Sequence, residues 1–182
     1  MSLRFLPTSI AGVIQIEPEV FRDSRGFFLE TFHAKKYAAG GIPTTFVQDN
    51  HSSSVRGTLR GLHLQWHKPQ GKLVRVVSGE IFDVFVDLRK TSSTFGRWYG
   101  VKLSGENRLL AWIPAGFAHG FHVVSESAHV VYKANEFYFP ELERTVLWND
   151  PDLNIDWENT VVPLLSEKDN KGKLLKDAEL FP

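Results

Sequence analysis

Apolar residues recur along this chain mostly at every second position, in short runs that Gly, Pro, Asn and Ser interrupt. A period of two is typical of β-strands with one buried face, and short runs at this spacing favour antiparallel sheets. So many short strands favour closure into a barrel or jelly roll, because both folds leave few exposed sheet edges. The predicted strands cover residues 12–18, 27–31, 45–50, 72–77, 81–88, 96–103, 109–113, 119–124, 130–137 and 144–148.

The clearest pattern is a hairpin formed by residues 72–77 and 81–88, which a Ser78-Gly79-Glu80 turn connects. In its second strand, apolar side chains alternate with Asp83 and Asp87. Because successive side chains of a strand point to opposite faces, the apolar side chains share one face and the carboxylates the other. We therefore expect the two carboxylates on the polar face of the hairpin.

Helices are expected to be few and short. Residues 32–39 suit one helix that ends at Gly40-Gly41, and Ser166-Glu167-Lys168-Asp169 has the pattern of a capping box that opens another. The chain of 182 residues contains no repeat, low-complexity tract or linker and suits one domain, residues 1–182. The predicted fold class is all-β and mainly antiparallel, with a few short helices.

The amino-acid composition limits the kinds of molecule that this protein can be expected to bind. Lys plus Arg and Asp plus Glu number 21 each, so the formal net charge is +0 and no long-range positive field attracts nucleic acid or an anionic membrane. An anionic ligand must therefore be held locally. The absence of cysteine excludes disulfides, thiolate metal sites and cysteine nucleophiles. The first residues do not resemble a signal peptide and no apolar run is long enough to span a membrane, which predicts a cytoplasmic protein.

Candidate chemistry is concentrated in residues 57–72, GTLRGLHLQWHKPQGK, which combine histidines, lysines and an arginine. This segment is compatible with a metal site, a proton-transfer site or a basic loop. Its spacing is Gly57-x5-His63-x-Gln65, followed by Lys72-x6-Gly79, and it resembles the first motif of the cupin family, a family of small β-barrels. Pro114-x-Gly116-x-x-His119 resembles the second cupin motif.

The residues at the metal-ligand positions of these motifs argue against a metal. Metal-binding cupins supply three histidines and a glutamate, whereas here only His63 and His119 remain, with Gln65 and Lys72 at the other two positions. An ammonium repels a dication and an amide oxygen is a poor ligand for a transition metal, so we predict no metal. His67 follows His63 by four residues, which is not a pairing distance on a strand, and is expected to be a surface loop residue.

A metal-free set of polar residues can still transfer protons. His63 is the candidate base, and Lys72 and Arg60 can stabilise an oxygen that becomes negative when the proton leaves. Tyr132, in the predicted strand 130–137, can return a proton from the other side if it faces the barrel interior. Each of these residues also has a structural explanation as a packed or solvated side chain. The residues alone leave acid–base catalysis and a plain binding pocket equally open.

Several longer sequence blocks, spread along the whole chain, share one resemblance. They include Phe21-x-Asp23-x-Arg25-Gly26-Phe27-Phe28-x-Glu30, Leu59-Arg60-Gly61-Leu62-His63-x-Gln65, Ile113-Pro114-x-Gly116-Phe117-Ala118-His119-Gly120-Phe121 and Leu165-Ser166-x-Lys168-Asp169. These blocks resemble the dTDP-4-dehydrorhamnose 3,5-epimerase family, enzymes of dTDP-L-rhamnose synthesis with a cupin-type jelly-roll β-barrel.

This resemblance implies an isomerase that acts on dTDP-4-dehydro-6-deoxy-D-glucose. The C4 ketone of this sugar acidifies the hydrogens at C3 and C5, and the enzyme inverts both carbons through enolates, without cofactor or metal, to give dTDP-4-dehydro-L-rhamnose. By matching position, His63 is the base with Asp169 as its partner, Tyr132 is the acid, and Lys72 stabilises the enolate oxygen. Asp169 has the alternative of serving only its helix cap. The implied substrate-binding residues are Arg25, Glu30, Gln48, Asn50, Arg60, His119, Tyr138, Glu143 and Lys168.

The resemblance also implies a homodimer, in which an N-terminal segment of about residues 1–45 contributes contacts and Phe21, Phe27 and Phe28 help to cover the nucleotide of the other subunit. Asn135-Glu136-Phe137 departs from the Thr-rich sequence typical of the family, which bears on substrate preference. Three alternatives remain open. They are a single-centre 3- or 5-epimerase or ketoisomerase on a related nucleotide sugar, a non-catalytic cupin that binds sugar nucleotides, and a metal-dependent cupin oxygenase.

Overall fold

The protein is described by a computed structural model that covers residues 2–158 and 162–182. One sheet contains β1 (Arg4–Pro7), β2 (Ile14–Glu17), β5 (Gln48–Val55), β7 (Lys72–Ser78), β10 (Leu110–Ile113) and β12 (Ser127–Ala134). The other contains β6 (Leu59–Gln65), β8 (Glu80–Asp87), β9 (Trp98–Ser104), β11 (Phe117–Val123) and β13 (Glu143–Thr145). The remaining elements are β3 (Val20–Asp23), β4 (Gly26–Leu29), helices α1 (Ala34–Ala39) and α2 (Glu167–Asn170), and 3-10 turns η1 (Pro140–Leu142) and η2 (Leu175–Asp177).

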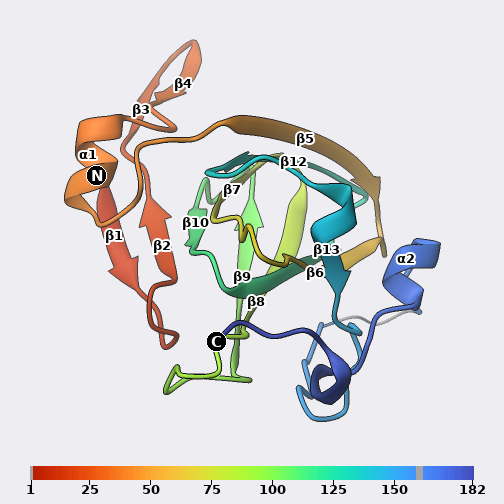
Figure 1. Cartoon of the computed structure of the whole chain (residues 1–182). Helices are drawn as coiled ribbons and strands as arrows, with labels where there is room; N and C mark the ends of the chain where they lie inside the picture. Colours follow the sequence, from red (N-terminus) through yellow and green to blue (C-terminus); the bar gives the residue numbers. More distant parts are fainter. Residues whose placement is uncertain (1, 159–161) are drawn as a thin grey trace.

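Two sheets form the body of the fold, as Figure 1 shows. The strand orders are β1-β2-β10-β7-β12-β5 and β13-β6-β11-β8-β9, and β3 pairs with β4 in a separate hairpin. Every ladder between these described strands is antiparallel, and only isolated bridges are parallel. The prediction of an all-β, mainly antiparallel jelly roll with a few short helices is confirmed. No helix in the described part of the chain is long and apolar enough to cross a membrane.

The two sheets face each other across an apolar interior. Val74 of β7 and Val130 of β12 form one wall, and Phe85 of β8 and Phe121 of β11 form the other; all four belong to one buried cluster. Burial of such side chains contributes about 25 cal/mol per Å² of apolar surface removed from water. Because side chains of both sheets pack together in this interior, it sets the distance between the two walls that carry the polar residues described below.

Two further apolar clusters cover the outer faces of the sheets. The C-terminal part of the chain places Trp157 and Phe181 against the outer side of β8, where they pack with Val84 and Val86. On the other sheet, Tyr37 of α1 is buried against the outer side of β7 and β10. Both sheets are thus covered on part of each face, which explains how strands with alternating polarity can be buried on both sides.

Each predicted strand and helix corresponds to an observed element, with shifted ends. The largest shift is in β5, which continues to Val55 because His51 and the serines that follow it pair with β12. Strands β1, β3 and β6 were not predicted. In β6 the residues Leu59, Gly61, Leu62 and Leu64 are all buried, so the strand lacks the alternation by which a half-buried strand is recognised.

The position of the two β8 carboxylates differs from the prediction. The predicted hairpin itself does not form: β7 pairs with β10 and β12 in one sheet, and β8 pairs with β11 and β9 in the other, so the Ser78-Gly79-Glu80 segment connects the two sheets. Asp83 and Asp87 are 0% exposed and lie on the interior face of β8 with Ile81 and Phe85, not on a polar face. The prediction was wrong because both faces of β8 are covered. Alternation shows that two sets of side chains point in opposite directions, but it does not show which set meets solvent.

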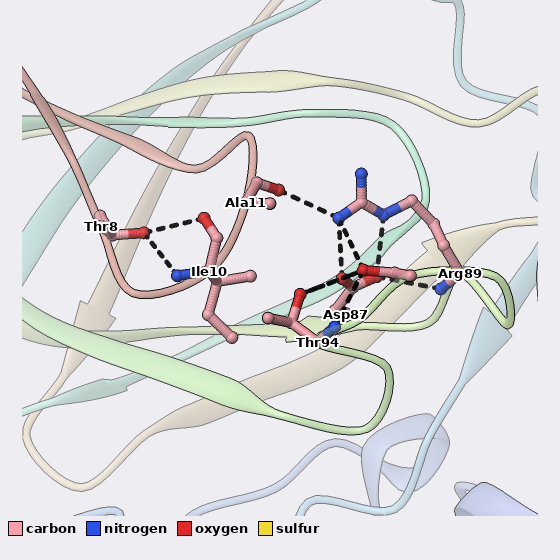
Figure 2. Close-up of polar contacts among 7 residues, drawn as sticks. Thr8, Ile10, Ala11, Asp87, Arg89 and Thr94 are labelled. Carbon is pink, nitrogen blue, oxygen red and sulfur yellow. Dashed lines mark hydrogen bonds and ion pairs between the residues drawn. The ribbon is translucent and has the colours of Figure 1, made fainter.

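Asp87 is held by a dense set of hydrogen bonds (Figure 2). Its carboxylate accepts hydrogen bonds from Arg89 Nε at 2.8 Å, Arg89 Nη2 at 2.7 Å, Ser92 Oγ at 2.6 Å and Thr94 Oγ1 at 2.7 Å. Arg89 Nη2 also donates to the carbonyl oxygen of Ala11 at 3.0 Å. The carboxylate therefore connects the loop after β8 to the turn between β1 and β2.

Replacing Asp87 with Asn should lower the free energy of unfolding by about 3 kcal/mol at neutral pH, because the Arg89 guanidinium loses its carboxylate partner. Burial by itself raises the pKa of Asp87, but the hydrogen bonds from Arg89, Ser92 and Thr94 outweigh burial and lower this pKa from 3.8 to about 2. The ionised carboxylate thus stabilises the native state above about pH 4, and this contribution is lost as the pH falls toward 2.

Urea unfolding of both proteins at several pH values checks this assignment. The stability difference between the wild type and Asp87→Asn should be largest at neutral pH and should shrink between about pH 4 and 2. A difference that stays constant over this range would contradict the role given to the ionised carboxylate.

Candidate active site

A cavity of about 310 Å³ opens between the two sheets, and it collects most of the predicted site residues. Asp169 does not line the cavity but contacts His63, which does. Two other predicted residues, Arg25 and Glu30, lie outside the cavity lining. The cavity is lined by Gln48, Asn50, Ser52, Arg60, His63, Gln70, Lys72, His119, Gly120, Phe121, Tyr132, Tyr138, Glu143 and Lys168.

His63 and Asp169 form a hydrogen-bonded pair on the wall made by the five-stranded sheet. His63 Nε2 and Asp169 Oδ1 are 2.5 Å apart. The predicted capping box places the carboxylate: the Asp169 backbone N–H donates to Ser166 Oγ at 3.1 Å, and Ser166 Oγ donates to Asp169 Oδ2 at 2.7 Å. Asp169 thus contributes both to its helix cap and to the orientation of His63, so the two roles considered for it are compatible.

The charges of this pair suit a proton acceptor. Burial lowers the pKa of His63, although the hydrogen bond and the charge of Asp169 act in the opposite direction. Burial by itself raises the pKa of Asp169, but the hydrogen bonds from His63 and Ser166 outweigh it and lower this pKa. A neutral His63 that donates from Nε2 to the carboxylate keeps a free lone pair on Nδ1. That nitrogen lies 4.0 Å from Glu143, on the cavity side.

Tyr132 lies on the opposite wall, on the interior face of β12, which is the orientation that a role as proton donor requires. It packs against the interior apolar cluster next to Val130. Burial raises the pKa of Tyr132, and the negative charge of Glu143 acts in the same direction, so the phenol stays protonated at neutral pH. His63 belongs to the five-stranded sheet and Tyr132 to the six-stranded sheet. A neutral imidazole and a protonated phenol therefore face the same cavity from different walls.

Lys72 lies on β7, on the same sheet as Tyr132, with its Nζ 5.8 Å from the centre of the Tyr132 ring. Burial lowers the pKa of Lys72 to about 8, while the charges of Glu143 and Asp83 partly oppose that effect. The amine is therefore mostly an ammonium at neutral pH and can stabilise a negative oxygen inside the cavity.

A second histidine–carboxylate pair, formed by His119 and Asp83, was not predicted. His119 Nε2 and Asp83 Oδ1 are 2.6 Å apart, and Asp83 Oδ2 has no hydrogen-bond partner among the described residues. Burial raises the pKa of Asp83, against the charges of His119 and Lys72. The pair depends on the register in which β11 and β8 align, with Phe121 opposite Asp83, and no local sequence signal encodes that register.

The mouth of the cavity is polar and carries cations. Glu143 accepts hydrogen bonds from Tyr138 Oη at 2.7 Å and from Lys168 Nζ at 2.8 Å. Burial by itself raises the pKa of Glu143, but the hydrogen bonds from Lys168 and Tyr138 lower it below the ordinary value. Burial and the bond to Glu143 raise the pKa of Tyr138 to about 12. Arg60 Nε donates to Ser54 Oγ at 3.1 Å at the same mouth.

Two predicted binding residues lie away from this cavity. Arg25 is at the exposed turn of the β3–β4 hairpin, where it forms an ion pair with Asp23 at 2.5 Å. Glu30 forms an ion pair with Lys36 of α1 at 2.9 Å. Figure 1 shows the hairpin extending away from the two sheets. Within one chain, these residues therefore do not join the other predicted binding residues.

The donor atoms near His63 and His119 do not suit a divalent metal. Both histidines are already hydrogen-bonded to carboxylates, and Gln65 uses its amide oxygen to accept the backbone N–H of Phe139 at 2.8 Å. The space that these three side chains share with Lys72 is only about 10 Å³. Within residues 2–158 and 162–182, no group of three or more His, Cys, Asp or Glu side chains is arranged to hold a metal ion.

Comparison with known proteins gives consistent matches over almost the whole chain. The profile described as dTDP-4-dehydrorhamnose 3,5-epimerase matches residues 7–177. The dTDP-4-dehydrorhamnose 3,5-epimerase of Pseudomonas aeruginosa is 57% identical over 175 residues, which is 96% of this chain and 97% of that protein. The enzyme of the same name from Methanothermobacter thermautotrophicus is 53% identical over 180 residues, with 98% and 97% coverage.

A solved structure shows the same fold with a bound nucleotide sugar. The dTDP-6-deoxy-D-glucose-3,5-epimerase of Legionella pneumophila, in complex with dTDP-4-keto-L-rhamnose, superposes with a TM-score of 0.95 at 49% sequence identity. The alignment covers 98% of this chain and 95% of that one.

Replacing Asp83 with Asn should lower the pKa of Lys72 further below its value of about 8, because the variant lacks one of the two negative charges that raise it against burial. An NMR titration of the Lys72 side chain in the wild type and the variant measures this shift. Asp87→Asn is the matched control, since it makes the same change at the other buried carboxylate of β8. An unchanged Lys72 titration in Asp83→Asn would show that Asp83 is uncharged in the native protein.

Proposed function

The chain belongs to the dTDP-4-dehydrorhamnose 3,5-epimerase family, and from this premise we propose how its cavity inverts C3 and C5 of dTDP-4-dehydro-6-deoxy-D-glucose. The protein is an isomerase of the epimerase type. One observation carries the proposed assignment of roles: the His63–Asp169 pair and Tyr132 face one cavity from different sheets. Inversion requires this arrangement, because a single group that removed and returned the proton on one side would restore the starting centre.

Proton removal is assigned to His63. The Nδ1 lone pair takes the proton from C3 or C5. The electron pair of that C–H bond forms a double bond to C4, and the π electrons of the C4 carbonyl move to its oxygen, which gives an enolate. Asp169 stabilises the imidazolium that forms and keeps the ring oriented. The Lys72 ammonium stabilises the enolate oxygen, in an interior where fixed charges act strongly because water is excluded.

Proton delivery is assigned to Tyr132. Its phenol donates to the carbanionic carbon from the side opposite His63, so the carbon recovers its bond to hydrogen with inverted configuration. The raised pKa of the phenol, caused first by burial, keeps that proton available at neutral pH. Exchange with solvent then returns a proton to the tyrosinate and removes one from His63, and the same cycle at the second carbon completes dTDP-4-dehydro-L-rhamnose. No step uses a cofactor or a metal.

The mouth of the cavity is assigned to substrate binding. Its cations, Arg60 and Lys168, suit the diphosphate, which needs local positive charge because the chain has no net charge. The other binding residues proposed at this cavity are Gln48, Asn50, His119, Tyr138 and Glu143. A cytoplasmic location fits this assignment, because a charged nucleotide sugar does not cross a bilayer unaided.

Incubation with dTDP-4-dehydro-6-deoxy-D-glucose in deuterated water tests the reaction. NMR of the product should show deuterium at both C3 and C5, because each carbon loses its own proton and receives one that has exchanged with solvent. Incorporation at one carbon would indicate a single-centre epimerase instead. Binding of dTDP without any incorporation would defeat the proposed reaction.

Two variants separate the assigned roles in the same assay. His63→Asn should lower kcat by at least about a thousandfold, because a general base and its partner act on both carbons, whereas dTDP affinity should remain measurable.

Tyr132→Phe should reduce the amount of inverted product more than it reduces the loss of the substrate proton. Substantial turnover in His63→Asn, or an unchanged rate and product ratio in Tyr132→Phe, would contradict the respective assignment.

We infer that residues 1–182 act as one domain and that two copies associate as a homodimer, with contacts from about residues 1–45. The β3–β4 hairpin supports this inference, because Phe21, Phe27 and Phe28 are 53%, 53% and 68% exposed. Arg25 at the hairpin turn is separate from the cavity of its own chain. A two-fold dimer would bring Arg25 of each copy to the nucleotide in the other copy, since the same contact is then made twice.

Mixed dimers test this exchange of hairpins. Arg25→Ala and His63→Asn chains should each form a weakly active dimer, whereas a co-refolded one-to-one mixture should recover about a quarter of wild-type activity, because half of the dimers contain one intact site of two. The recovered sites combine His63 of one chain with Arg25 of the other. Activity of the mixture equal to the mean of the two parent proteins would show that Arg25 serves its own chain. Sedimentation of the wild type as a monomer would contradict the dimer.

A further inference from the structure

Residues 135–139, which we call the strap, follow β12 at the mouth of the cavity. The strap has no ladder hydrogen bonds to either sheet among the described strands, yet Tyr138 within it lines the cavity. A segment without strand pairing must satisfy its backbone N–H and C=O groups in some other way. At residues 136–139, side-chain amides supplied by the neighbouring strands and loops bind four of these groups. The Asn135 N–H donates instead to the carbonyl oxygen of Gly71 at 3.2 Å, and the Phe137 N–H donates to Glu136 Oε1 at 2.7 Å.

Gln65, at the end of β6, makes the largest share of these contacts. Its Nε2 donates to the carbonyl oxygen of Phe137 at 2.9 Å and to that of Lys68 at 2.6 Å. Its Oε1 accepts the backbone N–H of Phe139 at 2.8 Å. The side chain is 5% exposed, and both its donor and its acceptor groups bind backbone. Gln65 therefore joins the strap on both sides of Tyr138 to the loop that leaves β6.

Two other glutamines bind the strap. One holds Tyr138, which lies between the two residues bound by Gln65, and the other holds Glu136, which precedes them. Gln48 Oε1 accepts the backbone N–H of Tyr138 at 2.9 Å, and Gln70 Nε2 donates to the carbonyl oxygen of Glu136 at 2.8 Å. The strap is thus bonded by amides at successive residues. Of the three glutamines, Gln65 is the most deeply buried and the one with three bonds.

We propose that Gln65 is a positioning residue that holds the strap, and Tyr138 with it, in the binding arrangement before the nucleotide sugar arrives. This inference rests on the proposed function of the cavity. A strap that is already ordered loses less conformational entropy when the ligand binds, so it raises affinity without adding any contact. Gln65 occupies the inward position at which metal-binding cupins have a histidine ligand, and here the same position supports the wall of a binding site.

The effect should fall on binding more than on proton transfer. Tyr138 donates to Glu143, which in turn accepts from Lys168, so a displaced strap disturbs this row at the cavity mouth. The base and the acid are held by other contacts, because His63 lies within the β6 ladder and Tyr132 within the β12 ladders. Loosening the strap therefore leaves the reacting groups in place.

Gln65→Met tests the proposal, because it keeps the length of the side chain, removes its three hydrogen bonds and adds no charge near Lys72. Amide hydrogen exchange of the peptide that contains the strap should become about tenfold faster in the free enzyme. KM should rise about tenfold while kcat stays within about twofold of the wild type, since binding alone is affected. Gln15→Met is the matched control on β2, outside the cavity lining, and should change neither quantity.

Unchanged exchange in the strap of Gln65→Met would overturn the proposal. Faster exchange with unchanged KM would overturn it too, because the strap would then be held by Gln65 without serving the site. If circular dichroism shows that Gln65→Met does not fold, Gln65→Leu removes the same three hydrogen bonds with a smaller uncharged side chain and is judged by the same two measurements.

The proposal and the reaction can fail separately. A wild-type enzyme that binds dTDP but incorporates no deuterium would defeat the reaction. In that event, calorimetric affinity for dTDP replaces KM in the comparison. A roughly tenfold weaker affinity in Gln65→Met, together with faster exchange, would still support the role of Gln65, and equal affinities would overturn it.

Discussion

Charged side chains can be buried between two β-sheets only where hydrogen bonds or nearby opposite charges offset their removal from water, and this constraint organises the interior of the protein. Among the described residues, three buried aspartates are matched by a basic side chain: Asp87 by Arg89, Asp169 by His63, and Asp83 by His119. A fourth, Asp150, accepts hydrogen bonds from the backbone N–H groups of Asp152, Leu153 and Leu175. Without such partners, carboxylates in a low-dielectric interior would become neutral or would destabilise the fold. The apolar cluster between the sheets sets the spacing, and the ion pairs allow polar chemistry inside it.

The same burial that requires partners also sets the protonation states that the proposed chemistry uses. Removal from water disfavours charge, so it lowers the pKa of His63 and raises that of Tyr132. One wall thus presents a neutral base and the other a protonated acid. Lys72 is subject to the same effect but keeps a pKa of about 8, because Glu143 and Asp83 supply nearby negative charge. The ammonium therefore persists where an enolate oxygen would form.

In metal-binding cupins, metal coordination fixes the interior side chains, whereas in this protein hydrogen bonds do so. Asp169 and Asp83 each hold one histidine, and Gln65 binds backbone on both sides of Tyr138. Among residues 2–158 and 162–182, no set of donor side chains is arranged to hold a dication. These contacts hold the candidate reacting groups and the cavity mouth by hydrogen bonds within the protein, as the proposed pre-organisation of the site requires.

The sequence alone determined the strands with alternating polarity and the two short helices, and it indicated candidate site residues that lie within continuous motifs, such as His63, His119 and Asp169. These features are local, because alternation and capping involve residues close together in the chain. Only the tertiary structure decided that Asp83 and Asp87 face the interior and that Asp83 binds His119. Those facts depend on which layer covers each face of β8 and on the register of β8 against β11, and residues far apart in sequence set both.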